Sequence, residues 1–184
     1  MSLTLLVTML LAFAFSISIA VAIGGSAMLG IALFDPERLI LAPKEMFTAI
    51  DKFPLAAIPF FILAGNLMET GGISRRLVDF AKSLVGGVQG GLHMTCVLTC
   101  MIFAAVSGSS VATTFAIGAI LIPALIKHGY PTPYAAALQA TSAELGVIIP
   151  PSIPMILFGV SAEVSIGELF IAGVVPGLLI GCAL

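Results

Sequence analysis

The beginning of the chain constrains its fold most, because residues 3–34 form one apolar run without a charged side chain. Shorter apolar runs follow. Charged residues make up only 9% of the 184 residues, against about 25% in soluble domains. So few charges cannot cover a surface that faces water, whereas lipid can face such a surface. Backbone groups in lipid must pair within helices or closed barrels. The sequence therefore predicts an all-α membrane protein with transmembrane helices.

The same composition excludes several classes of function. The formal net charge of −2 and the lack of a basic stripe argue against a nucleic-acid partner. The sequence has no Gly-Lys-Ser phosphate loop, so nothing indicates ATP hydrolysis. Ser109 has no His or Asp partner within reach by sequence, and we expect neither an enzyme nor a cofactor. Cys96, Cys100 and Cys182 lie in apolar runs, and we expect buried, inert thiols rather than a metal site.

Residues 1–69 are predicted to form N-terminal transmembrane or scaffold helices. The run 3–34 is too long for a signal peptide and has no preceding Lys or Arg. We interpret it as a retained spanning helix, interrupted by small residues at 24–26. A polar loop, 35–52, follows and contains a predicted short interfacial helix at 43–50. Residues 53–69 form a second run of barely spanning length, in which Asn66 is interpreted as a packing polar group.

Residues 70–91 are predicted to form an amphipathic linker helix, on the membrane surface or between two spans. Its apolar residues recur on one face at helical spacing, namely Ile73, Leu77, Phe80 and Leu84. Its charged residues fall elsewhere, and glycine pairs end it. His93 and His128 lie at the ends of the apolar runs that follow, so we expect both to be interfacial.

The polar stretch Ser107-Gly108-Ser109-Ser110 interrupts the next apolar region. About 15 apolar residues precede it and about 12 follow it, so each arm is shorter than a bilayer core of about 30 Å. Two short arms around a small polar tip favour a re-entrant helical hairpin over residues 92–126. By the positive-inside rule, Lys82 and Lys127 would place both ends of the hairpin in the cytoplasm. The alternative is one spanning helix over about 96–123 that packs against a neighbour.

A second interruption divides a discontinuous helix predicted over residues 134–160. Pro150 and Pro151 have no N–H, so the carbonyls from residues 146 to 149 lose helical partners. In lipid such carbonyls persist only where protein, water or an ion satisfies them. Together with the hydroxyl of Ser152 or Ser142, they would form an oxygen site suited to Na⁺, as broken helices do in secondary transporters. The alternative is a proline-kinked helix without a ligand.

The two interruptions are expected to meet. We predict that residues 107–110 form a turn between antiparallel half-helices, and that residues 146–152 are non-helical and lie within a few ångströms of that turn, since one ion would serve both. Glu144 is interpreted as a proton relay or a support for the ion site, or else as a side chain that reaches water from a helix end. The last run, 169–184, contains Pro176 and has no polar cap, so we expect a truncated helix and a fragment of a longer protein.

The stretch from Ser107 to Leu179 resembles the large membrane subunit of TRAP (tripartite ATP-independent periplasmic, DctM-like) transporters. The motifs that carry the resemblance are SGSS at 107–110, IIPPS at 148–152 and SIGELF at 165–170. The upstream segment AAIPFFILAGNLMETGG at 56–72 fits the same family. Thr113 is a departure, because many relatives carry an Asp near this position.

The resemblance implies the first half of an inverted-repeat, elevator-type transporter, with residues 92–184 as half of a transport domain. It implies a Na⁺-coupled permease of the bacterial inner membrane that imports an organic acid, such as a dicarboxylate or a sialate. The implied partners are a periplasmic binding protein and a small membrane subunit, and Na⁺ is the coupling ion. The alternative function is a truncated, non-transporting membrane fragment or helical scaffold.

The resemblance also assigns residues to the site. The predicted Na⁺-binding residues are Ser107, Gly108, Ser109, Ser110, Gly146, Ile149, Pro150, Pro151 and Ser152. Candidates that face the substrate are Ser110, Thr113 and Ser152. No metal other than Na⁺ is expected.

Overall fold

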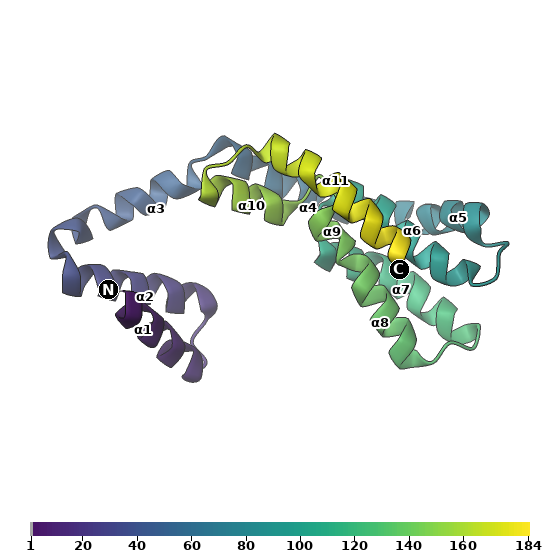
Figure 1. The fold of residues 1–184 in the computed structure, drawn as a ribbon, viewed down its shortest axis with the longest axis horizontal. Coiled ribbons are helices and arrows are strands. Elements are labelled where there is room, and N and C mark those ends of the chain that lie inside the picture. The colour runs from purple at the N-terminus through teal and green to yellow at the C-terminus, as the bar shows by residue number, and fades with distance from the viewer. Residues whose placement is uncertain (1) are drawn as a thin grey trace. The chain divides into compact units, whose positions relative to one another are not determined.

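The computed structural model describes residues 2–184. The chain is 84% helical, and the described residues contain no strand, which confirms the all-α fold class. It divides into two compact units, residues 1–52 and residues 53–184 (Figure 1). Each unit is described by itself below.

The first unit begins with two helices rather than one. Helix α1 (Ser2–Ala14) and helix α2 (Ile19–Phe34) are separated by a turn in which Ser16 has a φ of 57°. They run antiparallel, because Gly30, near the end of α2, lies against Leu5 of α1. The prediction of one spanning helix over residues 3–34 was therefore wrong. The turn at residues 15–18 is apolar apart from two serines, so hydropathy alone could not reveal it.

The small residues of α2 mark a packing face. Residues 24–26 lie within the helix and do not interrupt it, contrary to the prediction. The buried residues Ala22, Ser26 and Gly30 recur every four positions, and such spacing lets two helix backbones approach closely in a membrane. A 3₁₀ turn, η1 (Pro36–Ile40), and helix α3 (Ala42–Ile50) complete the unit. Helix α3 confirms the helix predicted at 43–50.

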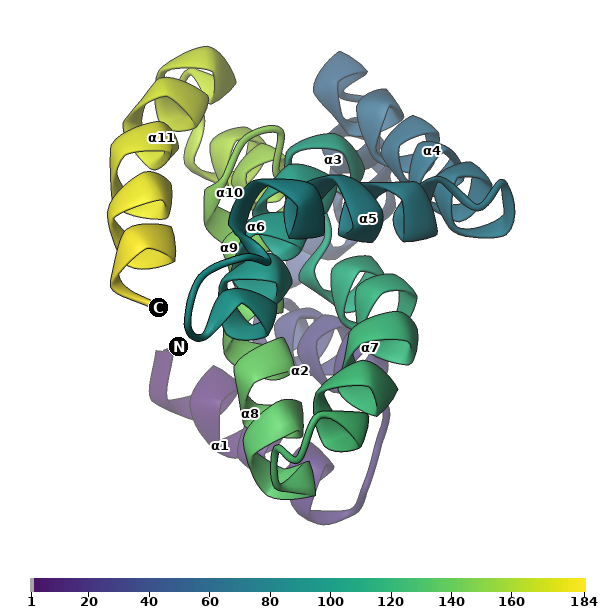
Figure 2. The ribbon, with the colours of Figure 1, turned by 90° about the vertical axis from the view of Figure 1, so that its right-hand side faces the viewer.

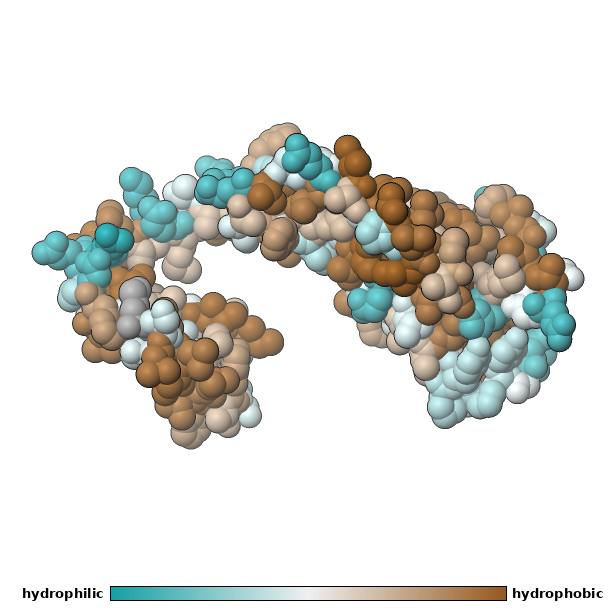
Figure 3. Space-filling view, viewed as in Figure 1, coloured by the Kyte–Doolittle hydropathy of each residue, from teal (hydrophilic) through white to brown (hydrophobic). Residues whose placement is uncertain are grey.

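The second unit holds the remaining helices. They are η2 (Phe53–Ala56), α4 (Ala57–Thr70), α5 (Ile73–Val85), α6 (Gly91–Ser107), α7 (Ser110–Lys127), α8 (Thr132–Ala143), α9 (Leu145–Ile148), α10 (Ile153–Ala162) and α11 (Ile166–Ala183). By length and composition, three segments can cross a membrane: Phe53–Thr70, Ser110–Lys127 and Ile166–Ala183. A fourth span results if the pair α8–α9 and α10, bent by 42°, is counted as one. Helix α11 stays continuous through Pro176, and its surface is largely apolar (Figure 3).

The core of this unit forms around α6, which packs against α5, α7, α8 and α9 (Figure 2). The fully buried side chains Cys96, Cys100 and Phe103 of α6 belong to one apolar cluster with Ile117 and Leu121 of α7. In a membrane such burial stabilises the unit through close van der Waals packing between helices rather than through removal of apolar surface from water. This packing fixes the ends of α6 and α7, which meet at the first predicted break.

Helix α5 confirms the predicted amphipathic helix but packs through a different face. Its buried residues are Ser74, Val78 and Ala81, which lie against α6. Three residues of the predicted apolar stripe point outward instead, since Ile73, Phe80 and Leu84 are 42%, 53% and 60% exposed. The fourth, Leu77, is partly buried and packs against the core. The charged residues occupy a third side of the helix, as 100° per residue requires. The outward stripe of α5 is therefore suited to lipid, and the smaller residues are suited to close helix packing.

The turn at residues 107–110 is confirmed, and the continuous helix over 96–123 is not found. Helix α6 ends at Ser107 and α7 begins at Ser110, with Gly108 in the left-handed conformation. The two helices are antiparallel, because Leu92 at the start of α6 lines one cavity with His128 after the end of α7. The helices on either side of the turn contain 17 and 18 residues. The second helix is longer than the predicted arm because residues Ser110 to Thr114 are helical too. The second arm can therefore span a membrane, and re-entrance remains a prediction.

The second break is shorter than predicted. Residues 146–148 lie in α9, so the prediction of a non-helical segment over 146–152 was wrong for these three residues. They keep their own N–H groups, and a proline removes only the donor at its own position. The helix ends at Ile148 because Ile149, directly before Pro150, is extended with a ψ of 124°, as residues before proline usually are. The Pro150–Pro151 peptide bond is cis.

Candidate functional site

The two breaks lie against each other. The backbone N–H of Ile153 donates to the carbonyl of Gly108, with an N–O distance of 3.0 Å. A Cβ atom added at Gly108 would lie 2.7 Å from the carbonyl oxygen of Pro151. A Cβ atom added at Gly146 would lie 3.1 Å from the backbone nitrogen of Ser110. The predicted proximity of the two breaks is confirmed, and glycine is required where the backbones are closest.

Four helix ends converge at this point. Helices α7 and α10 begin here, capped by Ser109 and Ser152, whose hydroxyl oxygens accept from Ala112 N at 3.3 Å and Met155 N at 3.4 Å. Helices α6 and α9 end here. Helix N-termini carry partial positive charge and helix C-termini carry partial negative charge. The junction therefore brings together N–H groups, which can bind an anion, and carbonyl groups, which can bind a cation.

Fewer carbonyls are open at the second break than predicted. The hydroxyl of Ser152 donates to the carbonyl of Val147 at 2.6 Å, and Leu145 accepts from Ile149 N at 2.8 Å. The carbonyl of Gly146 has no donor four residues on, because that residue is Pro150. The carbonyl of Val147 loses its donor in the same way to Pro151, but of these two carbonyls only that of Val147 has a side-chain donor in its place among the described residues.

The candidates for substrate contact differ in exposure. Thr113 and Ser152 are fully buried, whereas Ser110 is partly exposed. The hydroxyl of Thr113 donates to the carbonyl of Ser109 at 2.8 Å and lies 3.5 Å from the hydroxyl of Ser107. In this structure Thr113 braces the tip of the hairpin from inside. A threonine can do this without the desolvation cost that a buried carboxylate would carry.

A cavity of about 290 Å³ lies beside the tip of the hairpin. Its lining includes Ser107 and Ser109 from the tip and Asn66 and Glu69 from α4. Asn66 is exposed, so it does not pack against a neighbour as predicted. The residues that line the cavity carry amide, carboxylate and hydroxyl oxygens, which are the ligand types that hard cations prefer. Sequence analysis left Glu69 out of the site because it ends an apolar run far from both breaks.

Glu144 lies at the junction of α8 and α9 and is exposed. Within residues 2–184 it forms no salt bridge, since the structure places only Arg38 and Asp35 in such a pair. Its carboxylate therefore does not take part in the contacts between the two breaks. Its role as a relay or support remains a prediction.

Sequence analysis missed Gln139, which joins three helices. Its side chain is 1% exposed; its Oε1 accepts from the thiol of Cys96 at 3.3 Å, and its Nε2 donates to the carbonyl of Thr113 at 3.4 Å. It thereby ties α8 to both arms of the hairpin. The available signal was its spacing, because Ala135, Gln139 and Ser142 lie on one face of a helix. The thiols of Cys96 and Cys100 are buried as predicted, whereas Cys182 is exposed, contrary to the prediction.

Replacing Gln139 with leucine is expected to destabilise the full-length permease by about 1–3 kcal/mol, because buried polar groups lose their partner while volume is nearly kept. Gln89→Leu, in an exposed loop, is the control and should change stability little. Thermal unfolding in detergent measures the difference. Equal melting temperatures for Gln139→Leu and wild type would contradict a structural role of Gln139.

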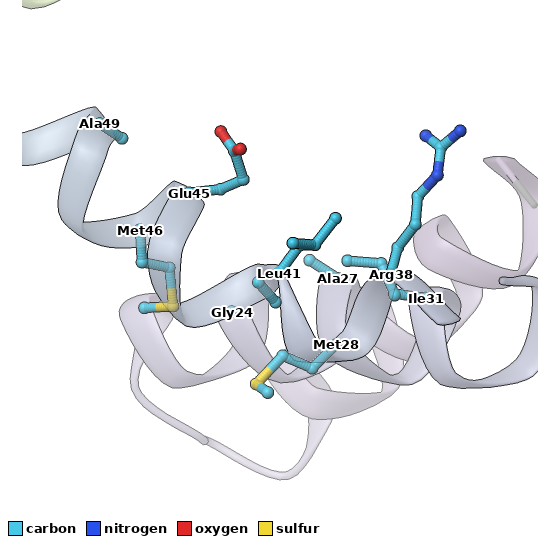
Figure 4. A pocket seen from close by; sticks show the side chains of 10 residues that line it. Gly24, Ala27, Met28, Ile31, Arg38, Leu41, Glu45, Met46 and Ala49 are labelled. Atoms are coloured by element: carbon cyan, nitrogen blue, oxygen red, sulfur yellow. The ribbon is translucent and has the colours of Figure 1, made fainter. Parts of the chain in front are cut away.

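A cavity within the first unit has a different character. It measures about 590 Å³ and is lined mainly by apolar residues of α2 and α3. Arg38 and Glu45 also line it, and Figure 4 shows their charged ends directed to the same side. Arg38 Nε already lies 2.7 Å from the carboxylate of Asp35. This apolar groove lacks the converging helix ends of the second unit.

Comparisons with known proteins point to one family. The family model described as "Tripartite ATP-independent periplasmic transporter, DctM component" matches residues 4–184. The chain is 47% identical over 163 residues to the C4-dicarboxylate TRAP transporter large permease protein DctM of Pseudomonas aeruginosa. It is 52% identical over 138 residues to the isethionate TRAP transporter permease protein DctMQ of Oleidesulfovibrio alaskensis. It is 44% identical over 161 residues to the 2,3-diketo-L-gulonate TRAP transporter large permease protein YiaN of Escherichia coli.

These matches cover most of this chain but a smaller share of each relative. They include 89%, 75% and 88% of the chain, and 38%, 22% and 37% of the respective relatives. The family consists of transporter permeases, and the apolar helices are those of a multi-pass membrane protein. With a family model that matches nearly the whole chain and relatives at 44–52% identity, the chain belongs to the DctM component family, the large permeases of tripartite ATP-independent periplasmic transporters.

Proposed function

We propose that this chain is part of the large permease of a secondary transporter that imports small organic acids with Na⁺ as the coupling ion. The observation that carries the proposal is the junction of the two breaks, where Gly108 and Ile153 are hydrogen-bonded. Broken helices that meet in this way supply ion and substrate sites in secondary transporters. The chain would lie in the bacterial inner membrane, as expected for this family.

The two kinds of backbone group at the junction, N–H and carbonyl, support separate contacts to the substrate and to Na⁺. The N-termini of α7 and α10, capped by Ser109 and Ser152, would face the negative group of the substrate. The carbonyls at the ends of α6 and α9, above all that of Gly146, would contribute to the Na⁺ site. Ser107 and Ser110, at the tip, would supply further oxygens. The cation would neutralise the acid and lower the cost of bringing it to membrane depth.

The names of the relatives support the substrate class. C4-dicarboxylates, isethionate and 2,3-diketo-L-gulonate are all small organic anions. Two partners are part of the proposal: a periplasmic binding protein that delivers the acid, and a small membrane subunit. The name DctMQ is consistent with a permease in which such a subunit is fused to the large one.

Uptake into proteoliposomes tests this function. The full-length permease, its small subunit and its binding protein are reconstituted, and radiolabelled succinate is supplied with an inward Na⁺ gradient. We expect succinate uptake that requires both the Na⁺ gradient and the binding protein. The acid that the transporter prefers, added without label, should compete with succinate. Equal uptake when K⁺ replaces Na⁺ would contradict Na⁺ coupling, and uptake without the binding protein would contradict the delivery step.

A further inference from the structure

A second polar cavity lies at the end of the hairpin opposite the two breaks. It measures about 310 Å³ and is formed by the end of α5, the loop to α6, the start of α6 and the turn after α7. Both loops lie at the same end of this unit in Figure 1, and hydrophilic residues gather over the α7–α8 loop in Figure 3. The transport site proposed above does not use this cavity.

The cavity lining contains groups that bind phosphate. Lys82, His128 and Tyr130 line it. Lys82 takes part in no salt bridge within residues 2–184. The Nδ1 of His128 lies 2.8 Å from the carbonyl oxygen of Ala124. A carbonyl only accepts, so Nδ1 carries the proton. This contact orients the ring and leaves Nε2 for a ligand.

The backbone of the cavity is accessible as well. Gly86 and Gly91 line the cavity, and because they have no side chains a ligand can approach their backbone. The first N–H groups of α6, a helix of 17 residues, lie at this end of the hairpin. They add to the favourable potential for an anion that Lys82 creates in the cavity.

The location of the cavity matches the headgroup region of a membrane. Residues 91–126 of the hairpin contain no Asp, Glu, Lys or Arg, and the first cation after them is Lys127. This end of the hairpin therefore lies at the boundary between apolar and polar surroundings. Val88 lines the cavity, and Leu84 lies on the outward stripe of α5; they are 56% and 60% exposed. A lipid phosphate in the cavity would leave its acyl chains beside these apolar side chains.

We propose that this cavity binds the headgroup of an anionic phospholipid. Lys82 pairs with the phosphate, His128 and Tyr130 offer hydrogen bonds to headgroup oxygens, and Leu84 and Val88 contact the acyl chains. Basic pockets between transmembrane helices bind lipid headgroups in this way. Because the cavity joins the α5–α6 loop to the turn after α7, the bound lipid would hold the two ends of the hairpin together.

The test uses the full-length permease with its small subunit in detergent. Phosphatidylglycerol or phosphatidylcholine with the same acyl chains is titrated while thermal unfolding and native mass spectrometry report binding. The variants are Lys82→Gln and, as the matched control, Lys127→Gln, which removes the same charge one residue from His128 but outside the cavity. A third arm supplies potassium phosphate without lipid. Both lysines are exposed, and melting without lipid checks that each variant folds.

We expect phosphatidylglycerol to bind more tightly than phosphatidylcholine. Lys82→Gln should raise its half-saturating concentration about fivefold or more, and Lys127→Gln should leave it near the wild-type value. Phosphate alone should not reproduce the stabilisation. Equal effects of the two variants, equal binding of the two lipids, or full stabilisation by free phosphate would each overturn the proposal.

Discussion

An alanine at Gly108 is expected to disable transport by the full-length permease, whereas an alanine at Gly129 should leave transport close to wild type. Both glycines have positive φ angles, 63° and 89°, so each alanine costs about 1–2 kcal/mol in backbone strain. Only at Gly108 does the new Cβ meet another backbone, at 2.7 Å from the oxygen of Pro151. Nothing lies within 4 Å of a Cβ added at Gly129.

The difference between the two variants isolates the contact between the breaks. Relief of the overlap at Gly108 must move one break away from the other, at a further cost of about 1–3 kcal/mol. The hydrogen bond from Ile153 to Gly108 would be strained as well. Succinate uptake and thermal unfolding, measured side by side for both variants, give the result. Similar losses for Gly108→Ala and Gly129→Ala would show that close approach of the breaks is unimportant.

Local chemistry made the two breaks predictable. A short polar Gly-Ser stretch inside an apolar region favours a turn, and two adjacent prolines remove helical donors. The structure accordingly ends α6 at Ser107 and begins α10 at Ile153. The proximity of the breaks was also predictable, because both expose backbone groups at membrane depth that need partners. The hydrogen bond between Gly108 and Ile153 is one such partnership.

Helix packing could not be read from hydropathy in the same way. In α2, the small residues 24–26 were interpreted as an interruption but lie within the helix, and the buried residues Ala22, Ser26 and Gly30 form a packing face. In α5, the large residues Ile73, Phe80 and Leu84 point outward, whereas the smaller residues Ser74, Val78 and Ala81 are buried. In a membrane both lipid and protein accept apolar side chains, so hydrophobicity does not tell the two faces apart, whereas residue size does.

The polar contacts inside the hairpin join residues that are far apart in the sequence, so the sequence alone did not predict them. Gln139 lies 43 residues from Cys96 in the sequence and 26 residues from Thr113. No local motif connects these residues, and only the packing of α8 onto the hairpin brings them together. Asn66 and Glu69 of α4 reach the cavity beside the tip for the same reason.

The second large effect concerns Na⁺. Pro150→Ala is expected to raise the Na⁺ concentration for half-maximal uptake about tenfold or more. The alanine supplies an N–H that can donate to the carbonyl of Gly146 and frees Ile149 from the extended conformation. The carbonyl would then be withdrawn from the ion. The loss of one contact to a charged group costs about 1.5–3 kcal/mol, and every 1.4 kcal/mol is about tenfold in affinity. Ser109→Leu should act in the same direction by filling the tip with an apolar side chain.

Pro176→Ala provides the matched control. It makes the same substitution within α11, which is continuous through that proline. It restores an N–H without closing a break, so the Na⁺ dependence should stay near wild type. Docking of the proposed binding protein should survive in all three variants, because such a protein would contact the periplasmic surface rather than the junction. A change in Na⁺ dependence only in Pro150→Ala and Ser109→Leu would assign the ion to the breaks.

The most direct test of a Na⁺ site at the junction is ion binding to the permease without substrate. Thermal unfolding of the full-length protein is followed as Na⁺ replaces K⁺ at constant ionic strength, in wild type and in the Pro150→Ala and Pro176→Ala variants. We predict that Na⁺ stabilises wild type and Pro176→Ala with similar half-saturating concentrations, and that Pro150→Ala requires about tenfold more Na⁺. Equal half-saturating concentrations in all three proteins would contradict a Na⁺ site at the junction of the two breaks.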